Sequence, residues 1–237
     1  MAVREDLGFF IVADGMGGHA AGEVASRLVV EEAERYVAST AETEAGGTWP
    51  GPFDPTLGRD ANRLRGGLLA ANGRLAREVE LDAALNGMAT TAVALLAGAG
   101  GAGGGTLAHV GDSRAYLRRA NVLRRLTRDH SWVEEQVRAG MLTADAARRH
   151  PWRNIVTRAV SGAHDLEVEL AQVSLEAGDR VLLCSDGLSS VVAEAEIDRI
   201  LGTDLPLAAV CDRLVEDANA AGGPDNVTVV VVDVDAD

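Results

Sequence analysis

Aromatic residues and cysteine are scarce in this sequence, and each shortage narrows the class of protein. Phenylalanine, tryptophan and tyrosine make up only 3% of the residues, so the hydrophobic core must be built from Val, Leu, Ile and Ala. The only cysteines are Cys184 and Cys211, and each lies in an apolar stretch. The two cysteines are therefore interpreted as buried thiols, and a protein held together by a disulfide framework is excluded.

Positive charge and long apolar runs are also scarce. Acidic residues outnumber basic ones by 36 to 22, which gives a net charge of −14. Such a surface repels nucleic acid and anionic membranes, so neither is expected as a partner. The N-terminus has no apolar signal core, and no apolar run approaches the roughly 20 residues of a membrane helix. We therefore expect a cytoplasmic protein without membrane insertion, whose carboxylates either serve solubility or form clusters that need cations.

The remaining pattern predicts one mixed domain over residues 1–237, because neither repeats nor an interdomain linker interrupt it. Helical spacing and a Ser-x-x-Glu capping box at Ser131 predict helices near 20–38, 59–80, 131–149 and 205–220. Apolar runs predict strands at 8–13, 88–97, 106–119 (two strands around a tight turn), 166–173, 179–187 and 226–234. The glycine run at 98–105 is interpreted as a hairpin connection, since no Lys-Ser or Lys-Thr pair follows it as in a phosphate loop. Neighbouring strands with helices in blocks between them indicate an α+β fold of antiparallel sheets flanked by helices.

Four acidic residues share one local pattern, since each lies beside Gly, Ser or Asn at the end of an apolar strand. A single Asp-Gly pair is usually only a turn. Strand ends of one sandwich can converge, however, and the converging carboxylates would then require cations such as Mg²⁺ or Mn²⁺. Two such ions roughly 3.5–4 Å apart can share a hydroxide that attacks phosphorus in line. The residues are Asp14, Asp112, Asp186 and Asp225.

Seven ordered motifs resemble the bacterial branch of the type-2C, metal-dependent Ser/Thr protein phosphatases (the PPM family). The resemblance extends from about residue 8 to residue 235. The motifs are ADGMGGHAAGE (13–23), GMATT (87–91), HVGDSRAYLRR (109–119), LTRDHS (126–131), RRHPWRNIVTRAVSG (148–162), LLCSDGLS (182–189) and GGPDNVTVVVV (222–232).

The resemblance implies a four-layer α/β/β/α sandwich and a site with two Mn²⁺ or Mg²⁺ ions, or three. In such a site Asp14 would bridge two metals and the Gly15 carbonyl would bind one. Asp186 and Asp225 would hold the other metal, and Asp112 with Asp186 a weaker third. Residues 131–162 would form a flap beside the site, with Asn154 where some relatives supply a third-metal ligand. The implied substrates are phosphorylated proteins, the targets of Ser/Thr kinases.

Two departures from the family pattern are visible. Bacterial relatives begin with strands that carry an Arg and an Asn-Glu-Asp motif, and these strands are expected to be absent here. Arg4, Glu5 and Asp6 match that composition but not its place in the chain, so we do not transfer the roles. Relatives often have Asp where this chain has Ser190. The oligomeric state is not predicted.

Several residues have both a catalytic and a structural interpretation. His19 could protonate the leaving serine oxygen or serve at the start of a helix. His109 is predicted to be a core residue, and His130 and His150 flap or surface residues; no two histidines have the sequence spacing typical of a zinc site. Arg114 and Arg158 could each face the site or pair with a carboxylate, and pairing is the favoured prediction. Cys184 has no Arg six positions later, which excludes the cysteine-phosphatase mechanism.

Two functions therefore remain open. The aspartate set favours a working protein serine/threonine phosphatase. The expected absence of the N-terminal strands favours a non-catalytic relative that binds phosphoproteins or acts as a scaffold.

Overall fold

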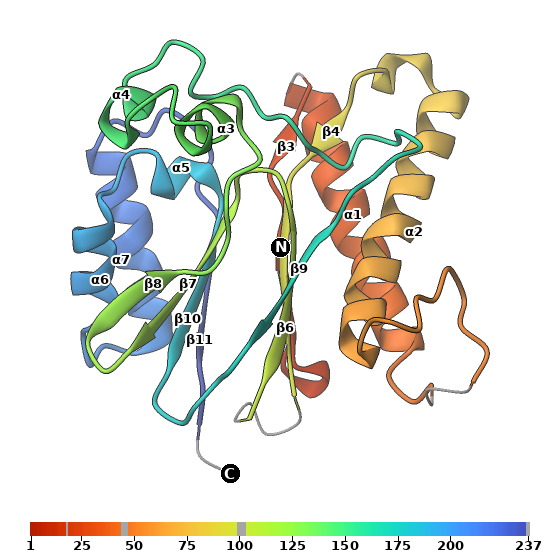
Figure 1. Ribbon diagram of the computed structural model, residues 1–237, viewed down its shortest axis with the longest axis horizontal. Helices are drawn as coiled ribbons and strands as arrows, with labels where there is room; N and C mark the ends of the chain where they lie inside the picture. Colours follow the sequence, from red (N-terminus) through yellow and green to blue (C-terminus); the bar gives the residue numbers. More distant parts are fainter. Residues whose placement is uncertain (18, 44–46, 99–102, 236–237) are drawn as a thin grey trace.

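Two antiparallel sheets pack face to face in the computed structural model, which describes residues 1–17, 19–43, 47–98 and 103–235. Helices cover both outer faces, as Figure 1 shows. The first sheet has the strand order β1 (Ala2–Arg4), β2 (Phe9–Val12), β5 (Ala92–Ala97), β6 (Gly105–Val110), β9 (Glu169–Val173). The second has the order β11 (Val229–Asp233), β10 (Arg180–Cys184), β7 (Arg114–Arg119), β8 (Val122–Arg125). The predicted four-layer α/β/β/α sandwich is confirmed.

Strand β2 illustrates how the sequence builds the layers. Its four residues are all buried, because successive side chains point to opposite faces of the sheet and both faces are covered. Phe9 and Ile11 pack against the helices, whereas Phe10 and Val12 enter the core between the sheets. An uninterrupted apolar run is therefore what this position requires.

The outer helical layers are amphipathic. Helices α1 (His19–Ser39) and α2 (Arg59–Leu81) cover the first sheet, and α6 (Glu194–Leu201) and α7 (Leu207–Ala220) cover the second. On the second side Ile197, Val210 and Leu214 are fully buried against apolar side chains of β10 and β11. None of the helices among the described residues is long and apolar enough to cross a membrane.

The segment 131–162, called the flap below, carries the short helices α3 (Trp132–Arg138) and α4 (Ala144–Arg148). Ser131 caps α3, as the capping box predicts, through a bond from the Glu134 amide to its hydroxyl (3.4 Å), and Thr143 caps α4. The flap lies above the ends of both sheets in Figure 1. Its last part is tied down by Val160, whose amide and carbonyl both bond to Thr90 at 2.9 Å.

Strand register brings the strand ends to one end of the sandwich. In the first sheet the end of β2 pairs with the start of β5, which in turn pairs with the end of β6. After β6 the chain crosses to the second sheet through the turn at residues 111–113. There the start of β7 pairs with the end of β10, and the end of β10 pairs with the start of β11. Every loop that follows or precedes these ends therefore emerges on the same side.

The structure corrects several sequence predictions. The short strand β1 precedes residue 8, where no strand was expected. Strand β8 and helix α6 were not predicted, and the strands expected at 166–173 and 226–234 are shorter than proposed. The strand expected at 88–97 is split at Thr91 into β4 (Ala89–Thr90) and β5. The hairpin between β5 and β6 is confirmed by its pairing, although residues 99–102 of the glycine run lie outside the described residues.

Candidate metal centre

The four predicted aspartates lie in turns at the converging strand ends. Asp14 follows β2, Asp112 lies between β6 and β7, Asp186 begins the short helix α5 (Asp186–Ser189), and Asp225 precedes β11. The carboxyl groups of Asp14 and Asp186 lie within hydrogen-bonding reach of each other. Asp112 and Asp225 are close enough for their charges to act on Asp14. Residues up to 211 positions apart in the sequence thus form one acidic cluster.

Buried hydroxyl groups hold the Asp14 turn. The Asp14 carbonyl accepts bonds from the Thr91 amide and the Thr90 hydroxyl, both at 2.8 Å. The Asp14 amide donates to the Thr91 hydroxyl at 3.2 Å, and that hydroxyl bonds to the Ser113 hydroxyl at 2.6 Å. Because Ser113 follows Asp112, the two acidic turns are connected through side chains that water does not reach. Thr91, at the interruption of the strand, thus holds the Asp14 turn through both its amide and its hydroxyl.

A second hydroxyl, that of Ser185, connects the other two acidic turns. It donates to the Asn226 carbonyl at 3.2 Å and accepts from the Thr228 amide at 3.0 Å. Gly187 lies against the same turn, since a Cβ at this position would be 2.2 Å from the Asn226 carbonyl oxygen. The Asp-Gly pair at 186–187 is therefore required by close backbone packing as well as by the turn.

The cluster is electrostatically strained at neutral pH. Burial raises the pKa of Asp14 to about 8, and repulsion from Asp186 adds to the effect. Burial also raises the pKa of Asp112 to about 7 and shifts the pKa of Asp186 upward. Repulsion from Asp225 also contributes to the upward shift of the Asp186 pKa. Carboxylates that are partly buried and repel one another bind a cation readily, because its charge stabilises their ionised form.

Arg114 and Arg125, two of the arginines beside the centre, are already paired with a carboxylate. The chain contains no lysine, so every permanent cation is an arginine. Arg114 lies beside Asp112 and lowers the pKa of both Asp112 and Asp186, but its guanidinium is paired with Asp129 at 2.7 Å. Arg125 pairs with the same carboxylate at 2.5 Å. The prediction that Arg114 pairs with a carboxylate is confirmed, as is that of Arg158, which pairs with Glu167 at 3.1 Å.

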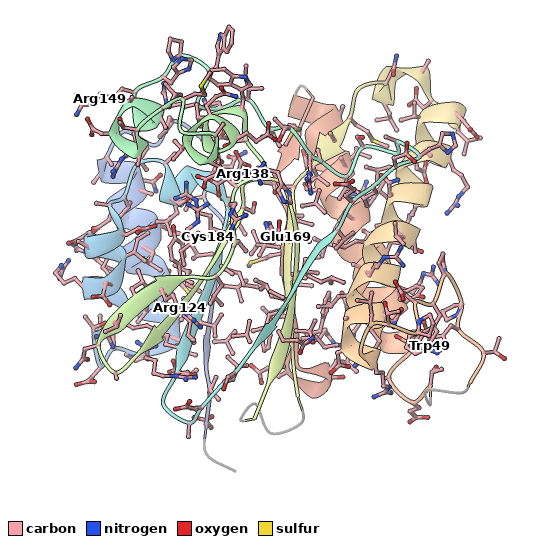
Figure 2. The ribbon with its side chains drawn as sticks, in the orientation of Figure 1. Trp49, Arg124, Arg138, Arg149, Glu169 and Cys184 are labelled. Carbon is pink, nitrogen blue, oxygen red and sulfur yellow. The ribbon has the colours of Figure 1, made fainter. Side chains whose placement is uncertain are left out.

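His130, predicted to be a flap or surface residue, is instead buried just before the flap. Its amide donates to the Gly111 carbonyl at 2.9 Å, and the Gly111 amide donates to its Nδ1 at 3.1 Å. Its Nε2 lies 3.1 Å from Glu169 of β9, which is labelled in Figure 2. His130 therefore joins the start of the flap to the residue before Asp112. The Asp-His-Ser sequence alone could not disclose this, because the bonds are all to distant segments.

His130 also stacks on the buried His109, with ring centroids 4.6 Å apart. Ligand atoms of these two residues and Glu169 lie within 4.8 Å of one another, a spacing that a metal ion can bridge. Nδ1 of His130 accepts a bond from an amide, however, so the proton of the neutral ring is on Nε2, which faces Glu169. Neither nitrogen of His130 has a free lone pair for a metal. The arrangement favours a structural role, and His109 is confirmed as a core residue.

The remaining candidates have the following positions. Gly15 follows Asp14 in the short strand β3 (Gly15–Met16), which pairs with β4. Asn154 and Ser190 line one cavity together with Asp112 and Asp186. His19 is the first residue of α1, and its side chain lies outside the described part of the structure.

The protein that carries this acidic centre matches a known family. The model described as protein phosphatase 2C matches residues 2–223. The chain is a member of that family. The sequence is 42% identical to the serine/threonine protein phosphatase PstP of Mycobacterium tuberculosis over 224 residues, which is 94% of this chain and 40% of PstP. It is also 38% identical to the serine/threonine phosphatase stp of Listeria monocytogenes over 98% of this chain and 86% of that protein.

Solved structures of protein phosphatase 2C members share the fold. The crystal structure of M. tuberculosis PstP superposes with a TM-score of 0.83 at 40% identity and covers 96% of this chain and 88% of its own. A PstP catalytic domain in complex with two manganese ions superposes with a TM-score of 0.78 at 39% identity, covering 96% of this chain and 87% of its own. The present chain thus spans less than half the length of full PstP, yet most of its crystallised domain.

Proposed function

We propose that this protein hydrolyses phosphoserine and phosphothreonine monoesters in proteins, using Mn²⁺ or Mg²⁺ held by the acidic centre. The observation that carries the proposal is the cluster of four converging carboxylates in a chain that belongs to the protein phosphatase 2C family. Relatives named as Ser/Thr phosphatases and the two manganese ions of a PstP structure support it.

The donor atoms suit hard divalent cations. All are oxygens, which Mg²⁺ and Mn²⁺ prefer over nitrogen or sulfur. The raised pKa values of Asp14 and Asp112 mean that the centre lacks positive charge, and the neighbouring Arg114 is already paired with Asp129. Two or three cations would supply that charge.

We assign the ligands as follows. Asp14 bridges two ions and the Gly15 carbonyl binds one of them, while Asp186 and Asp225 hold the other. Asp112 with Asp186 holds a weaker third. Bound divalent cations supply positive charge that activates the attacking water and neutralises the phosphoryl oxygens. The hydroxyl groups of Thr90, Thr91 and Ser185 keep the ligand turns in place before the ions arrive, which lowers the cost of ordering the site.

His19 remains our candidate for the group that protonates the leaving oxygen. It lies five positions after Asp14, at the start of α1. A His19→Gln variant should retain metal binding while losing activity mainly with alkyl phosphates, whose leaving groups need a proton, and much less with p-nitrophenyl phosphate. Equal losses with both substrates would favour the structural role instead.

The substrates in this proposal are proteins phosphorylated by Ser/Thr kinases. Because such kinases draw on ATP, we place the reaction in the cytoplasm. The alternative of a non-catalytic scaffold finds no support in the relatives PstP and stp, which are both named as phosphatases.

The decisive experiment measures p-nitrophenyl phosphate hydrolysis with Mn²⁺, with and without EDTA. We expect metal-dependent turnover in the wild type and a loss of about a hundredfold or more in Asp186→Asn, because charge stabilisation in the transition state is removed. Asp212→Asn, on the exposed side of α7, is the matched control and should behave as wild type. Calorimetric Mn²⁺ titration should show weakened binding only in Asp186→Asn. Turnover that is indifferent to EDTA, or an active Asp186→Asn variant, would refute the proposal.

A further inference from the structure

A cavity of about 550 Å³ lies between the flap and the segment that follows α5. Asp112 and Asp186 form part of its wall, so the cavity begins at the metal centre. Its volume falls in the range of cavities that bind small ligands, about 300–1,000 Å³. It is too large for a phosphate alone and leaves room for a neighbouring group of the substrate.

The lining of this cavity combines two kinds of side chain. Charged side chains include Asp112, Asp186 and the Arg114–Asp129 ion pair. Seven small aliphatic side chains also line it, contributed by the flap helices and by the segment after α5. These are Val133 and Val137 of α3, Ala144 and Ala147 of α4, and Val191, Val192 and Ala193.

Both walls of the cavity are held in place. On the flap side α3 and α4 are capped by Ser131 and Thr143, and Ser131 also forms a β-bridge with Val156. On the other side the Ser189 carbonyl accepts a bond from Arg114 at 3.4 Å. A preformed apolar slot is more selective than a loose surface, because little ordering is needed when a ligand enters.

We propose that this slot binds an apolar side chain adjacent to the phosphorylated serine or threonine of the substrate. The inference rests on the proposed function, which places the phosphate beside Asp112 and Asp186. Consecutive Cα atoms are 3.8 Å apart, so a neighbouring residue lies within the same cavity. A Val, Leu, Ile or Met side chain would leave water for the aliphatic wall, which a glycine cannot do. Hydrophobic slots of this kind discriminate by about 10–100-fold in kcat/KM.

Arg148 and Arg153 also line the cavity from the flap. They suggest the main alternative, in which the cavity binds an acidic side chain. If they dominated, an acidic neighbour would be preferred over an apolar one. The opposing carboxylates of Glu134 and Glu194 line the same cavity, so the net field offers an acidic side chain little advantage. We therefore favour the apolar occupant, and a glutamate peptide is included in the test.

The experiment compares phosphothreonine peptides that differ only at the two positions beside the phosphothreonine: leucine, glycine or glutamate. The variant Ala144→Trp fills the slot from an exposed position of α4, which makes misfolding easy to avoid. Ala146→Trp places the same side chain on the same helix at an exposed position that does not line the cavity, and is the matched control. Val137→Asp, which puts a charge in the apolar wall, is an independent second variant.

In the wild type we expect the leucine peptide to exceed the glycine and glutamate peptides by about 10–100-fold in kcat/KM. The preference should collapse in Ala144→Trp and Val137→Asp and persist in Ala146→Trp. Ala146→Trp, which lies outside the cavity, should leave hydrolysis of p-nitrophenyl phosphate unchanged, and thermal unfolding should show that Ala144→Trp and Val137→Asp remain folded. Equal rates for leucine and glycine peptides, a glutamate preference, or a leucine preference that survives Ala144→Trp would each overturn the proposal.

Peptide binding, measured without turnover, tests this inference independently of the proposed function. Fluorescence anisotropy of labelled peptides should show tighter binding of the leucine peptide to wild type and Ala146→Trp than to Ala144→Trp. If p-nitrophenyl phosphate is not hydrolysed by the wild type, the proposed function fails. In that case the leucine preference in binding, or its absence, still decides whether the slot exists.

Discussion

Replacing Asp14 by asparagine is expected to stabilise the metal-free protein at alkaline pH, although it removes a metal ligand. The carboxyl group of Asp14 has a pKa of about 8 in the folded state, against 3.8 for an unperturbed aspartate. Because the folded pKa is the higher one, the folded state binds more protons between about pH 4 and 8. The contribution of Asp14 to the free energy of unfolding is therefore complete below about pH 4 and is lost as the pH rises to about 8.

The magnitude follows from the size of this shift. Four pKa units at about 1.4 kcal/mol each set an upper limit of about 6 kcal/mol for a fully buried, isolated group. Asp14 is only half-buried, so water screens most of the penalty. We expect Asp14→Asn to raise the free energy of unfolding by roughly 2 kcal/mol at pH 8.5 in EDTA, after discounting for solvent screening.

The assay is urea unfolding of wild type and Asp14→Asn at pH 5 and pH 8.5, in EDTA and in excess Mn²⁺. At pH 5 in EDTA the two proteins should differ little, since Asp14 is then protonated. With Mn²⁺ at a hundred times its dissociation constant the wild type should gain about 2.7 kcal/mol, and the order of stability should reverse. Asp212→Asn serves as the control. A variant that is less stable than wild type in EDTA at pH 8.5 would show that the cluster is not strained as argued.

Two further predictions concern the supports of the centre. Gly187→Ala should destabilise the protein by about 1–3 kcal/mol, because the new methyl group would meet the Asn226 carbonyl oxygen at 2.2 Å, and it should weaken Mn²⁺ binding in calorimetry. Gly73→Ala in α2 has no neighbour closer than 3.7 Å and should stabilise by up to about 1 kcal/mol in thermal unfolding; equal effects of both changes would contradict the packing argument. His130→Phe keeps the stacked ring but leaves the Gly111 amide without its acceptor, which should cost about 1–3 kcal/mol in urea unfolding. A neutral effect of His130→Phe would show that water replaces the lost bond.

Much of the centre could be predicted from the sequence because its signal is local. Each aspartate lies at the end of an apolar run, and the turn residue beside it is visible in the chain. The buried run that contains Phe9 and Phe10 likewise indicates a strand covered on both faces. The motifs of a known family added the order of the parts and the expected ligand roles.

The missed elements lack such a signal. Strand β8 has the sequence VLRR and alternates between exposed and half-buried positions, which is too short to distinguish from a loop. Strand β1 was overlooked because its pairing with β2 defines it, not its own composition. Arg4 lies in β1 opposite Phe9, toward the end of β2 away from Asp14, and pairs there with Asp6 and Glu34. That position gives Arg4 no contact with the acidic centre, in agreement with the prediction that it does not bind phosphate.

Most of the long strands, the helices at 20–38, 59–80 and 205–220 and the four acidic turns follow from the sequence, because hydrophobic periodicity and turn chemistry act over a few residues. Tertiary structure alone decided which turns meet, since this depends on strand register between segments far apart in the chain. It also buried His130 against Gly111 and formed the slot between the flap and α5, because both require contacts that no local pattern encodes.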